Sequence, residues 1–269
     1  MPTAATELPT LPREDAGAGP PVVLVHGWSL SSAAFADEVA WLARERRAIA
    51  PDLRGHGRSP PPAAPFGLAD LARDLAALVE ALALDRAVLL GWSLGAEVAL
   101  AAAPLLRPRL SALVLVSGTP RFTEGEGWPH GLPARSVEGL ALRVRRDAPR
   151  AVARFFDGMF VEGELDGAGR ARAEKVRAAV PPADPAALLS GLDVLARADQ
   201  RAALPALDLP VLLVHGDRDP VCPPGASRAM AAAIPRARLV ELPGAGHAPF
   251  LSRPGPFRDA LGSFLGSLP

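Results

Sequence analysis

Short apolar runs alternate with stretches of helical periodicity along most of this chain. Six runs of Val, Leu, Ile and Ala have the length of buried strands, and we expect these strands at residues 22–25, 47–50, 88–90, 112–116, 211–214 and 238–242. Between them, apolar residues recur every three or four positions, which predicts helices at residues 35–44, 68–82, 96–103, 226–233 and 257–265. Strands that alternate with helices are typical of a mainly parallel sheet with helices on both faces. We therefore predict an α/β fold.

The alternation stops between residues 119 and 198, where only helical periodicity is evident, at residues 140–146, 151–160 and 171–179. We predict an inserted helical cap over 119–198, which divides a core made of residues 21–118 and 199–269. Residues 1–20 are rich in proline, alanine and acidic residues without a sustained period, so we expect a flexible leader and a fold that begins at Pro21. In such a sheet, sites form at the carboxyl ends of the strands, here facing the cap.

Composition narrows the range of partners. The 269 residues suffice for one large domain, and 29 basic residues balance 29 acidic residues, so no net charge attracts nucleic acid or an anionic membrane. Cys222 is the sole cysteine, which excludes an internal disulfide. No apolar run reaches the length that spans a membrane, and the first residues lack the pattern of a secretory signal. We expect a soluble cytoplasmic protein without nucleic-acid or membrane partners.

The sequence Gly-Trp-Ser-Leu-Gly at residues 91–95 is the strongest chemical signal. It follows an expected strand and precedes an expected helix, as a nucleophile elbow requires. Such a turn holds its serine in a strained conformation, and glycines two residues before and after leave room for it. Ser93 is therefore the predicted nucleophile. The alternative is an ordinary turn in which Ser93 caps the helix.

A serine nucleophile needs a histidine base that a buried acid orients. Among five histidines, only His247 lies in a loop after the last strand, where the order Ser, Asp, His of this kind of sheet places the base. The acid should follow the strand at 211–214, where Asp217 and Asp219 compete. We favour Asp219, because about three residues after Gly216 bring a carboxylate back toward the His247 loop, and we expect Asp217 to shape a local Asx turn.

An oxyanion hole needs two backbone N–H donors. We expect one from Leu94, directly after the nucleophile, and one from Trp28 in the loop after the first core strand. Trp28 is also expected in the wall of the site. The chemistry requires no metal and no organic cofactor.

Five segments together resemble the α/β-hydrolase superfamily over nearly the whole chain from Pro21: residues 26–28, 52–59, 91–95, 216–219 and 246–250. Finer features resemble the pimeloyl-acyl-carrier-protein methyl ester esterases of the biotin pathway. These are Gly-Trp-Ser-Leu-Gly itself, Trp28, residues 117–122 leading to Trp128-Pro129, and residues 191–195. The resemblance implies an α/β-hydrolase fold and cleavage of a methyl ester carried on an acyl-carrier protein.

The same resemblance implies roles for cap residues. A substrate channel would be lined by Phe155, Phe156, Asp157, Gly158 and Met159. The alternative is that this stretch is the apolar face of a cap helix that packs on the core. Arg150 and Arg154 share one helix face and would contact the acidic carrier, although a solvated basic face is equally typical of an arginine-rich chain.

These residues together predict a serine carboxylesterase that acts on a small ester substrate, with the carrier-linked methyl ester as the substrate that the resemblance implies. One alternative is a general esterase, acyltransferase or perhydrolase that uses the same residues with another acceptor. A second alternative is a homologue that binds its ligand without turnover.

Overall fold

The computed structural model describes residues 11–269 and contains a seven-stranded sheet in the order β1-β3-β2-β4-β5-β6-β7. Its only antiparallel pair within the described residues is β1 with β3, and the other neighbours are parallel. The strands are β1 (Arg13–Ala16), β2 (Pro21–Val25), β3 (Arg47–Pro51), β4 (Ala87–Trp92), β5 (Leu110–Val116), β6 (Val211–Gly216) and β7 (Ala237–Leu242). This mainly parallel sheet, flanked by helices, confirms the predicted fold class.

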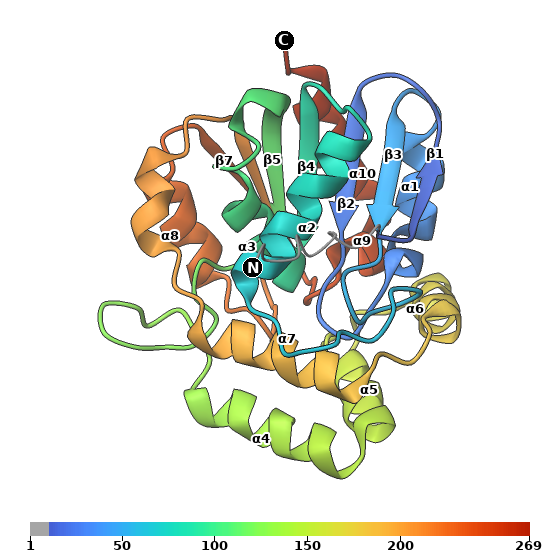
Figure 1. Cartoon of the computed structure of the whole chain (residues 1–269), viewed down its shortest axis with the longest axis vertical. Helices are drawn as coiled ribbons and strands as arrows, with labels where there is room; N and C mark the ends of the chain where they lie inside the picture. The colour runs from blue at the N-terminus through green and yellow to red at the C-terminus, as the bar shows by residue number, and fades with distance from the viewer. Residues whose placement is uncertain (1–10) are drawn as a thin grey trace, which may run out of the picture.

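Helices cover the sheet on both faces and form a separate layer at one end of it (Figure 1). Core helices are α1 (Ala36–Leu42), α2 (Leu68–Ala81), α3 (Leu94–Ala102), α8 (Gly225–Ala233), α9 (Pro249–Ser252) and α10 (Pro254–Gly266). Residues 11–269 also contain three 3₁₀ helices, η1 (Ser32–Phe35), η2 (Arg107–Arg109) and η3 (Arg201–Ala206). No helix among residues 11–269 combines the length and the apolar character needed to cross a membrane.

The layer at the end of the sheet consists of four helices between β5 and β6 (Figure 1). They are α4 (Ala134–Arg146), α5 (Ala148–Asp157), α6 (Gly167–Ala179) and α7 (Pro185–Arg197). All four fall within the residues that we assign to the cap, and α7, where we named no helix, packs against α4. Asp147, Asp166 and Asp184 cap the N-termini of α5, α6 and α7 through their side chains, so each cap helix after α4 begins at a defined residue.

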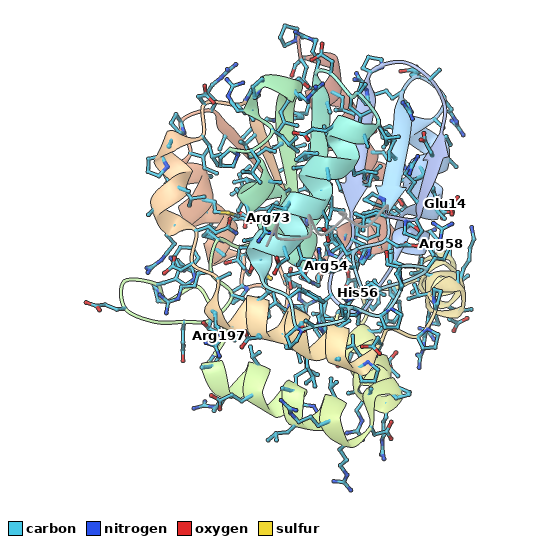
Figure 2. All side chains as sticks on the ribbon, viewed as in Figure 1. Glu14, Arg54, His56, Arg58, Arg73 and Arg197 are labelled. Carbon is cyan, nitrogen blue, oxygen red and sulfur yellow. The ribbon has the colours of Figure 1, made fainter. Side chains whose placement is uncertain are left out.

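The beginning of the core differs from the prediction. Residues 1–10 of the expected leader lie outside the described residues, but Arg13–Ala16 forms β1 and pairs with β3. This strand is charged and short, so it lacks the apolar alternation that predicts a strand, and backbone hydrogen bonds and ion pairs hold it instead. Arg47 binds Asp15 through two hydrogen bonds of 2.8 and 2.9 Å, and Arg58 lies 2.8 Å from Glu14 at this edge of the sheet (Figure 2).

The buried centre of the sheet fixes where the site forms. All six residues of β4 are buried, and its neighbours β2 and β5 are buried over almost their whole length. Parallel register pairs Val25 with Gly91 and Trp92 with Val116, so these strands end at nearly the same level. The residues that follow β2, β4 and β6 therefore gather at one edge of the sheet, beneath the cap.

Candidate active site

Ser93 lies between β4 and α3 with φ 56° and ψ −120°, a left-handed conformation that a side chain rarely adopts. Its backbone N–H donates to Val116 O at 3.0 Å, which holds the strained residue at the end of the sheet. A Cβ atom at Gly91 would collide with the carbonyl of Gly95, and one at Gly95 would collide with the carbonyl of Val25. Both glycines of the motif are thus required by close backbone approach, as a nucleophile elbow demands.

Asp219 and His247 are brought together from loops after β6 and β7. Asp219 Oδ2 accepts a hydrogen bond from Nδ1 of His247 at 2.8 Å, and both side chains are fully buried. Asp219 Oδ1 accepts from the backbone N–H groups of Val221 and Cys222 at 2.8 and 2.9 Å. Burial opposes ionisation of this carboxyl, but its interactions with His247 and His215 outweigh the effect of burial and hold the pKa of Asp219 well below its ordinary value.

The ring of His247 packs next to the elbow that carries Ser93. Because Nδ1 must carry a proton to donate to the carboxylate, Nε2 is the free basic nitrogen of a neutral ring. Within residues 11–269 this buried Nε2 has no hydrogen-bond partner. The ring of His247 packs 5.8 Å from that of Trp92, the residue before Ser93, and Nε1 of Trp92 donates to the carbonyl of His247 at 2.8 Å. The base is therefore anchored to the turn that carries the serine.

The two expected oxyanion donors flank Ser93. Leu94 is the first residue of α3, so its N–H has no acceptor within the helix. The loop that carries Trp28 touches the serine, because a Cβ atom at Gly27 would lie 3.2 Å from Cβ of Ser93. The indole of Trp28 joins this core loop to the cap, since its Nε1 donates to the carbonyl of Leu188 in α7 at 2.8 Å.

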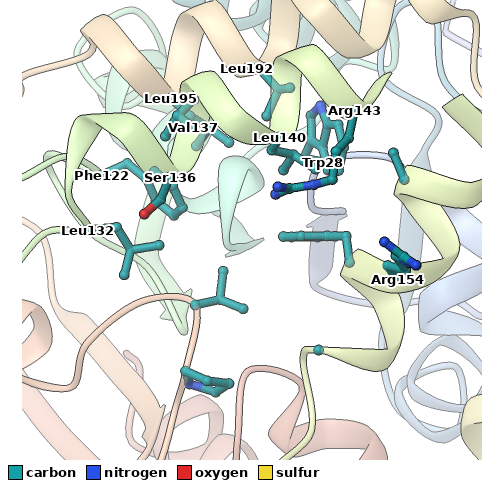
Figure 3. Close-up of a pocket in the computed structure, with 15 residues that line it drawn as sticks. Trp28, Phe122, Leu132, Ser136, Val137, Leu140, Arg143, Arg154, Leu192 and Leu195 are labelled. Atoms are coloured by element: carbon teal, nitrogen blue, oxygen red, sulfur yellow. The ribbon is translucent and has the colours of Figure 1, made fainter. Parts of the chain in front are cut away.

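A cavity of about 390 Å³ lies between the cap and the core, and Trp28 forms part of its wall (Figure 3). Pro220 and Val221, from the loop that carries Asp219, line it on the core side. The cap contributes mainly apolar side chains from α4, α5 and α7, including Val137, Leu140, Leu192 and Leu195. Such a cavity suits an apolar chain, and its lining residues do not include Ser93 or His247.

The expected channel residues separate into different environments. Phe155 and Gly158 line this cavity, and the Phe155 ring meets that of Trp28 edge to face at 4.9 Å. Phe156 is not among the lining residues, since it points to a second apolar cavity between α5 and the loop after β2. Asp157 is exposed and forms an ion pair of 2.8 Å with Arg177. Phe156 and Asp157 therefore lie outside this cavity, because neighbouring helical residues point in directions about 100° apart.

Met159 is buried and contributes through its backbone, since its carbonyl accepts from the N–H of His247 at 2.8 Å. Close to it lies a residue that sequence reasoning missed. Glu164 is buried, and its carboxylate accepts from Gly246 N–H at 2.7 Å and from Val161 N–H at 2.8 Å. The cap thus holds the loop of His247 at two successive residues. Nothing in the local sequence indicates a contact between positions 82 residues apart.

Asp217 also differs from its expected local role. Its Oδ1 accepts from the N–H of Gly244 at 2.7 Å, so it joins the loop after β6 to the loop after β7. Both aspartates therefore bind the loop that carries His247, but only Asp219 reaches the imidazole.

Arginines border the outer part of the cavity. Arg150 and Arg154 line a hollow of about 290 Å³ together with Arg143 and Arg146 of α4, two residues that sequence reasoning did not select. Arg143 and Arg154 also line the main cavity, as Figure 3 shows. Within residues 11–269, none of these four guanidinium groups has an acidic partner in an ion pair. Asp147 also lines the hollow, so the mouth of the cavity carries four guanidinium groups and one carboxylate and offers net positive charge to an anionic partner.

Comparison with known proteins agrees with this geometry. A family model described as the alpha/beta hydrolase fold matches residues 20–254. The chain belongs to the α/β-hydrolase family. It is 37% identical over 261 residues to a pimeloyl-[acyl-carrier protein] methyl ester esterase from Xanthomonas oryzae pv. oryzae, an alignment that covers 94% of this chain and 98% of that protein.

Solved structures of this family are similar to the chain over almost its full length. An esterase from Exiguobacterium antarcticum superposes with a TM-score of 0.88 at 28% identity, over 95% of both chains. A bromoperoxidase from Bacillus anthracis superposes with a TM-score of 0.87 at 27% identity, again over 95% of both chains. The same fold therefore serves more than one reaction, and the chemistry must be argued from the site.

Proposed function

We propose that this chain is a serine carboxylesterase in which Ser93, His247 and Asp219 form the catalytic triad. The observation that carries the proposal is the buried Asp219–His247 hydrogen bond of 2.8 Å, which leaves Nε2 of His247 without a partner among residues 11–269. The His247 ring packs on Trp92, the residue before the strained Ser93. Hydrogen bonds from the serine to its base are often long without substrate, so the absence of a Ser93–His247 bond within these residues agrees with this role.

In the proposed reaction, Nε2 of His247 takes the proton of Ser93 Oγ as this oxygen attacks the ester carbonyl. The N–H groups of Leu94 and Trp28 stabilise the oxyanion, and Asp219 stabilises the imidazolium. His247 then returns the proton to the leaving alkoxide, which departs as the alcohol. Water, activated by the same histidine, hydrolyses the acyl-enzyme and releases the acid.

We further propose that the substrate is a methyl ester linked to an acyl-carrier protein, as the name of the Xanthomonas relative states for that protein and as the sequence resemblance to the biotin-pathway esterases implies. An apolar cavity of about 390 Å³ suits an aliphatic acyl chain, and the cluster of arginines at its mouth suits the phosphate and acidic surface of a carrier. The ester end would then lie at Ser93 and the carrier outside the cap.

The test measures kcat/KM on methyl pimeloyl-carrier protein, free methyl pimelate and a short nitrophenyl ester under one set of conditions. Ser93→Ala should abolish turnover of all three, and a fluorophosphonate should add to Ser93 of the wild type alone. A higher kcat/KM on the carrier-linked ester supports the proposed substrate. Turnover by Ser93→Ala within about tenfold of the wild type would refute the triad.

One alternative use of the same residues has structural support, since a bromoperoxidase shares the fold at a TM-score of 0.87. An acyltransferase or perhydrolase would pass the acyl group to an alcohol or to peroxide faster than to water. Product analysis with each acceptor present distinguishes these activities from hydrolysis. A protein that binds without turnover would give neither product nor an acyl-enzyme burst.

A further inference from the structure

A second histidine lies behind the proposed catalytic acid. His215 is the penultimate residue of β6 and is completely buried. Its Nε2 lies 2.8 Å from the carbonyl of Cys222 and 3.2 Å from Oδ2 of Asp219, the same oxygen that accepts from His247. Its Nδ1 lies 2.5 Å from Oγ of Ser227 in α8, and Ser227 is also completely buried.

These contacts assign the protons of the pair. The Cys222 carbonyl and the Asp219 carboxylate can only accept hydrogen bonds, so Nε2 of His215 must carry a proton. In the neutral ring Nδ1 is then an acceptor, and the Ser227 hydroxyl donates to it. Ser227 thereby completes the hydrogen bonding of the neutral His215 ring, and His215 directs an N–H toward both ends of the turn from Asp219 to Cys222.

This turn is held from two sides. Asp219 Oδ1 accepts from the N–H groups of Val221 and Cys222, while the carbonyl of Cys222 accepts from His215. Asp219 Oδ2 therefore has two histidine N–H groups near it, His247 on the side of the site and His215 on the side of the core. The positive end of the His215 N–H reduces the negative charge that Oδ2 presents to His247.

We propose that His215, held in place by Ser227 and the Cys222 carbonyl, is a positioning residue of the triad: it orients Asp219 and moderates the carboxylate charge that faces His247. The inference rests on the proposed esterase function. Other titratable groups face this cluster, since Cys222 and Asp219 share it and the buried Glu97 of α3 lies near Cys222. Burial raises the pKa of both Glu97 and Cys222 well above their ordinary values, so it favours the neutral form of both groups.

The test compares pH profiles of kcat/KM on a short nitrophenyl ester for the wild type, His215→Leu, His215→Gln and Ser227→Ala. Without the His215 N–H, Oδ2 carries more charge, and His247 keeps its second proton to higher pH. We expect the acid limb of the His215→Leu profile to move up by roughly half a pH unit or more, with a plateau roughly tenfold lower. His215→Gln retains an N–H donor and should keep the acid limb at the wild-type position.

A purely structural role would lower the plateau of both His215 variants without moving the acid limb, and that result would overturn the proposal. If His215→Leu does not fold, Ser227→Ala decides, because it removes one hydroxyl only. Its acid limb should move in the same direction by a smaller amount, and a profile identical to that of the wild type would refute the proposal.

A second readout does not depend on ester turnover. Proton NMR at fixed pH should show the Nδ1 proton of His247 farther downfield in His215→Leu than in the wild type, because its acceptor is more negative. An unchanged resonance would contradict the role of His215. Absence of fluorophosphonate labelling at Ser93 of the wild type would instead contradict the proposed function, so the two failures are distinguishable.

Discussion

The carboxylate of Glu164, in the cap, accepts a hydrogen bond of 2.7 Å from the backbone N–H of Gly246, the residue before His247. A second bond from the cap follows at once, from His247 N–H to the carbonyl of Met159 at 2.8 Å. Arg253 strengthens this junction, because its guanidinium donates to the carbonyls of Glu164 and Gly244. The position of the proposed base is therefore determined partly by the cap, in addition to the sheet.

We expect Glu164→Ala to lower kcat by roughly tenfold or more and to change KM much less, since misplacing a catalytic group impairs the reaction more than it impairs binding. It should also lower the melting temperature, because the N–H groups of Gly246 and Val161 lose their acceptor. Steady-state kinetics on a short ester and thermal unfolding measure both effects. Glu162→Ala is the control, since Glu162 is exposed two residues away. Equal kinetics for the two variants would show that Glu164 does not position His247.

The two aspartates after β6 should differ sharply on substitution. Asp219→Asn replaces the acceptor of His247 with an amide that favours the wrong tautomer, so kcat should fall by at least about a thousandfold. Asp217→Asn keeps an amide oxygen that can accept from Gly244 N–H, so kcat should stay within a fewfold of the wild type. Both variants are assayed on one ester at one pH. The reverse ranking would move the acid role to Asp217.

A feature of this site can be predicted from the sequence when residues close to one another in the chain determine it. The elbow around Ser93 is specified by five consecutive residues, and the order of strands and helices predicts the loops of Asp219 and His247. The direction of a cap side chain is not local, because it depends on how α5 rotates against the core. Phe155 therefore faces the cavity while Phe156 faces away from it.

Contacts between distant segments have no sequence signal at all. Glu164 meets Gly246 only after the cap has packed on the core, and His215 meets Ser227 only after α8 has packed on the sheet. The charged strand Arg13–Ala16 is a similar case, since backbone pairing at a sheet edge requires no apolar pattern. Such features follow from tertiary packing, and periodicity does not reveal them.

His26, before the loop of Trp28, links stability to pH. Its Nδ1 lies 2.8 Å from the Gly27 carbonyl, so this nitrogen carries the proton, and its Nε2 accepts from Leu53 N–H at 3.0 Å. Burial, together with the neighbouring His56, lowers the pKa of His26 from 6.5 to about 4. Between these values the unfolded chain binds more protons than the folded chain, so the free energy of unfolding should fall as the pH decreases from 6.5 toward 4.

The loss attributable to His26 should be on the order of 3 kcal/mol over this range. His26→Gln cannot titrate, and its amide oxygen can still accept from Leu53 N–H, so its stability should decline less as the pH falls. Urea unfolding at several pH values measures the difference, and His130→Gln is the control for loss of a less buried histidine. If the wild type and His26→Gln lost stability in parallel, protonation of His26 would not be the cause.

The last prediction concerns the carrier. Arg150 and Arg154 lie at the mouth of the cavity without ion-pair partners among residues 11–269, so replacing both with alanine should weaken an acidic carrier's approach. We expect kcat/KM on the carrier-linked ester to fall roughly ten- to thirtyfold and to depend less on salt, since exposed charge pairs are individually weak and are screened. A short nitrophenyl ester, which carries no anionic group to meet these arginines, should be hydrolysed nearly as before.

The control removes the same charge from the same part of the cap. Arg135→Ala with Arg145→Ala changes two exposed arginines of α4 that do not line the hollow, so it should leave the carrier-linked ester almost unaffected. Equal loss on free and carrier-linked esters in the Arg150 and Arg154 variant would indicate a disturbed cap helix. Equal loss in both double variants would show that general positive charge attracts the carrier, without a specific role for Arg150 and Arg154.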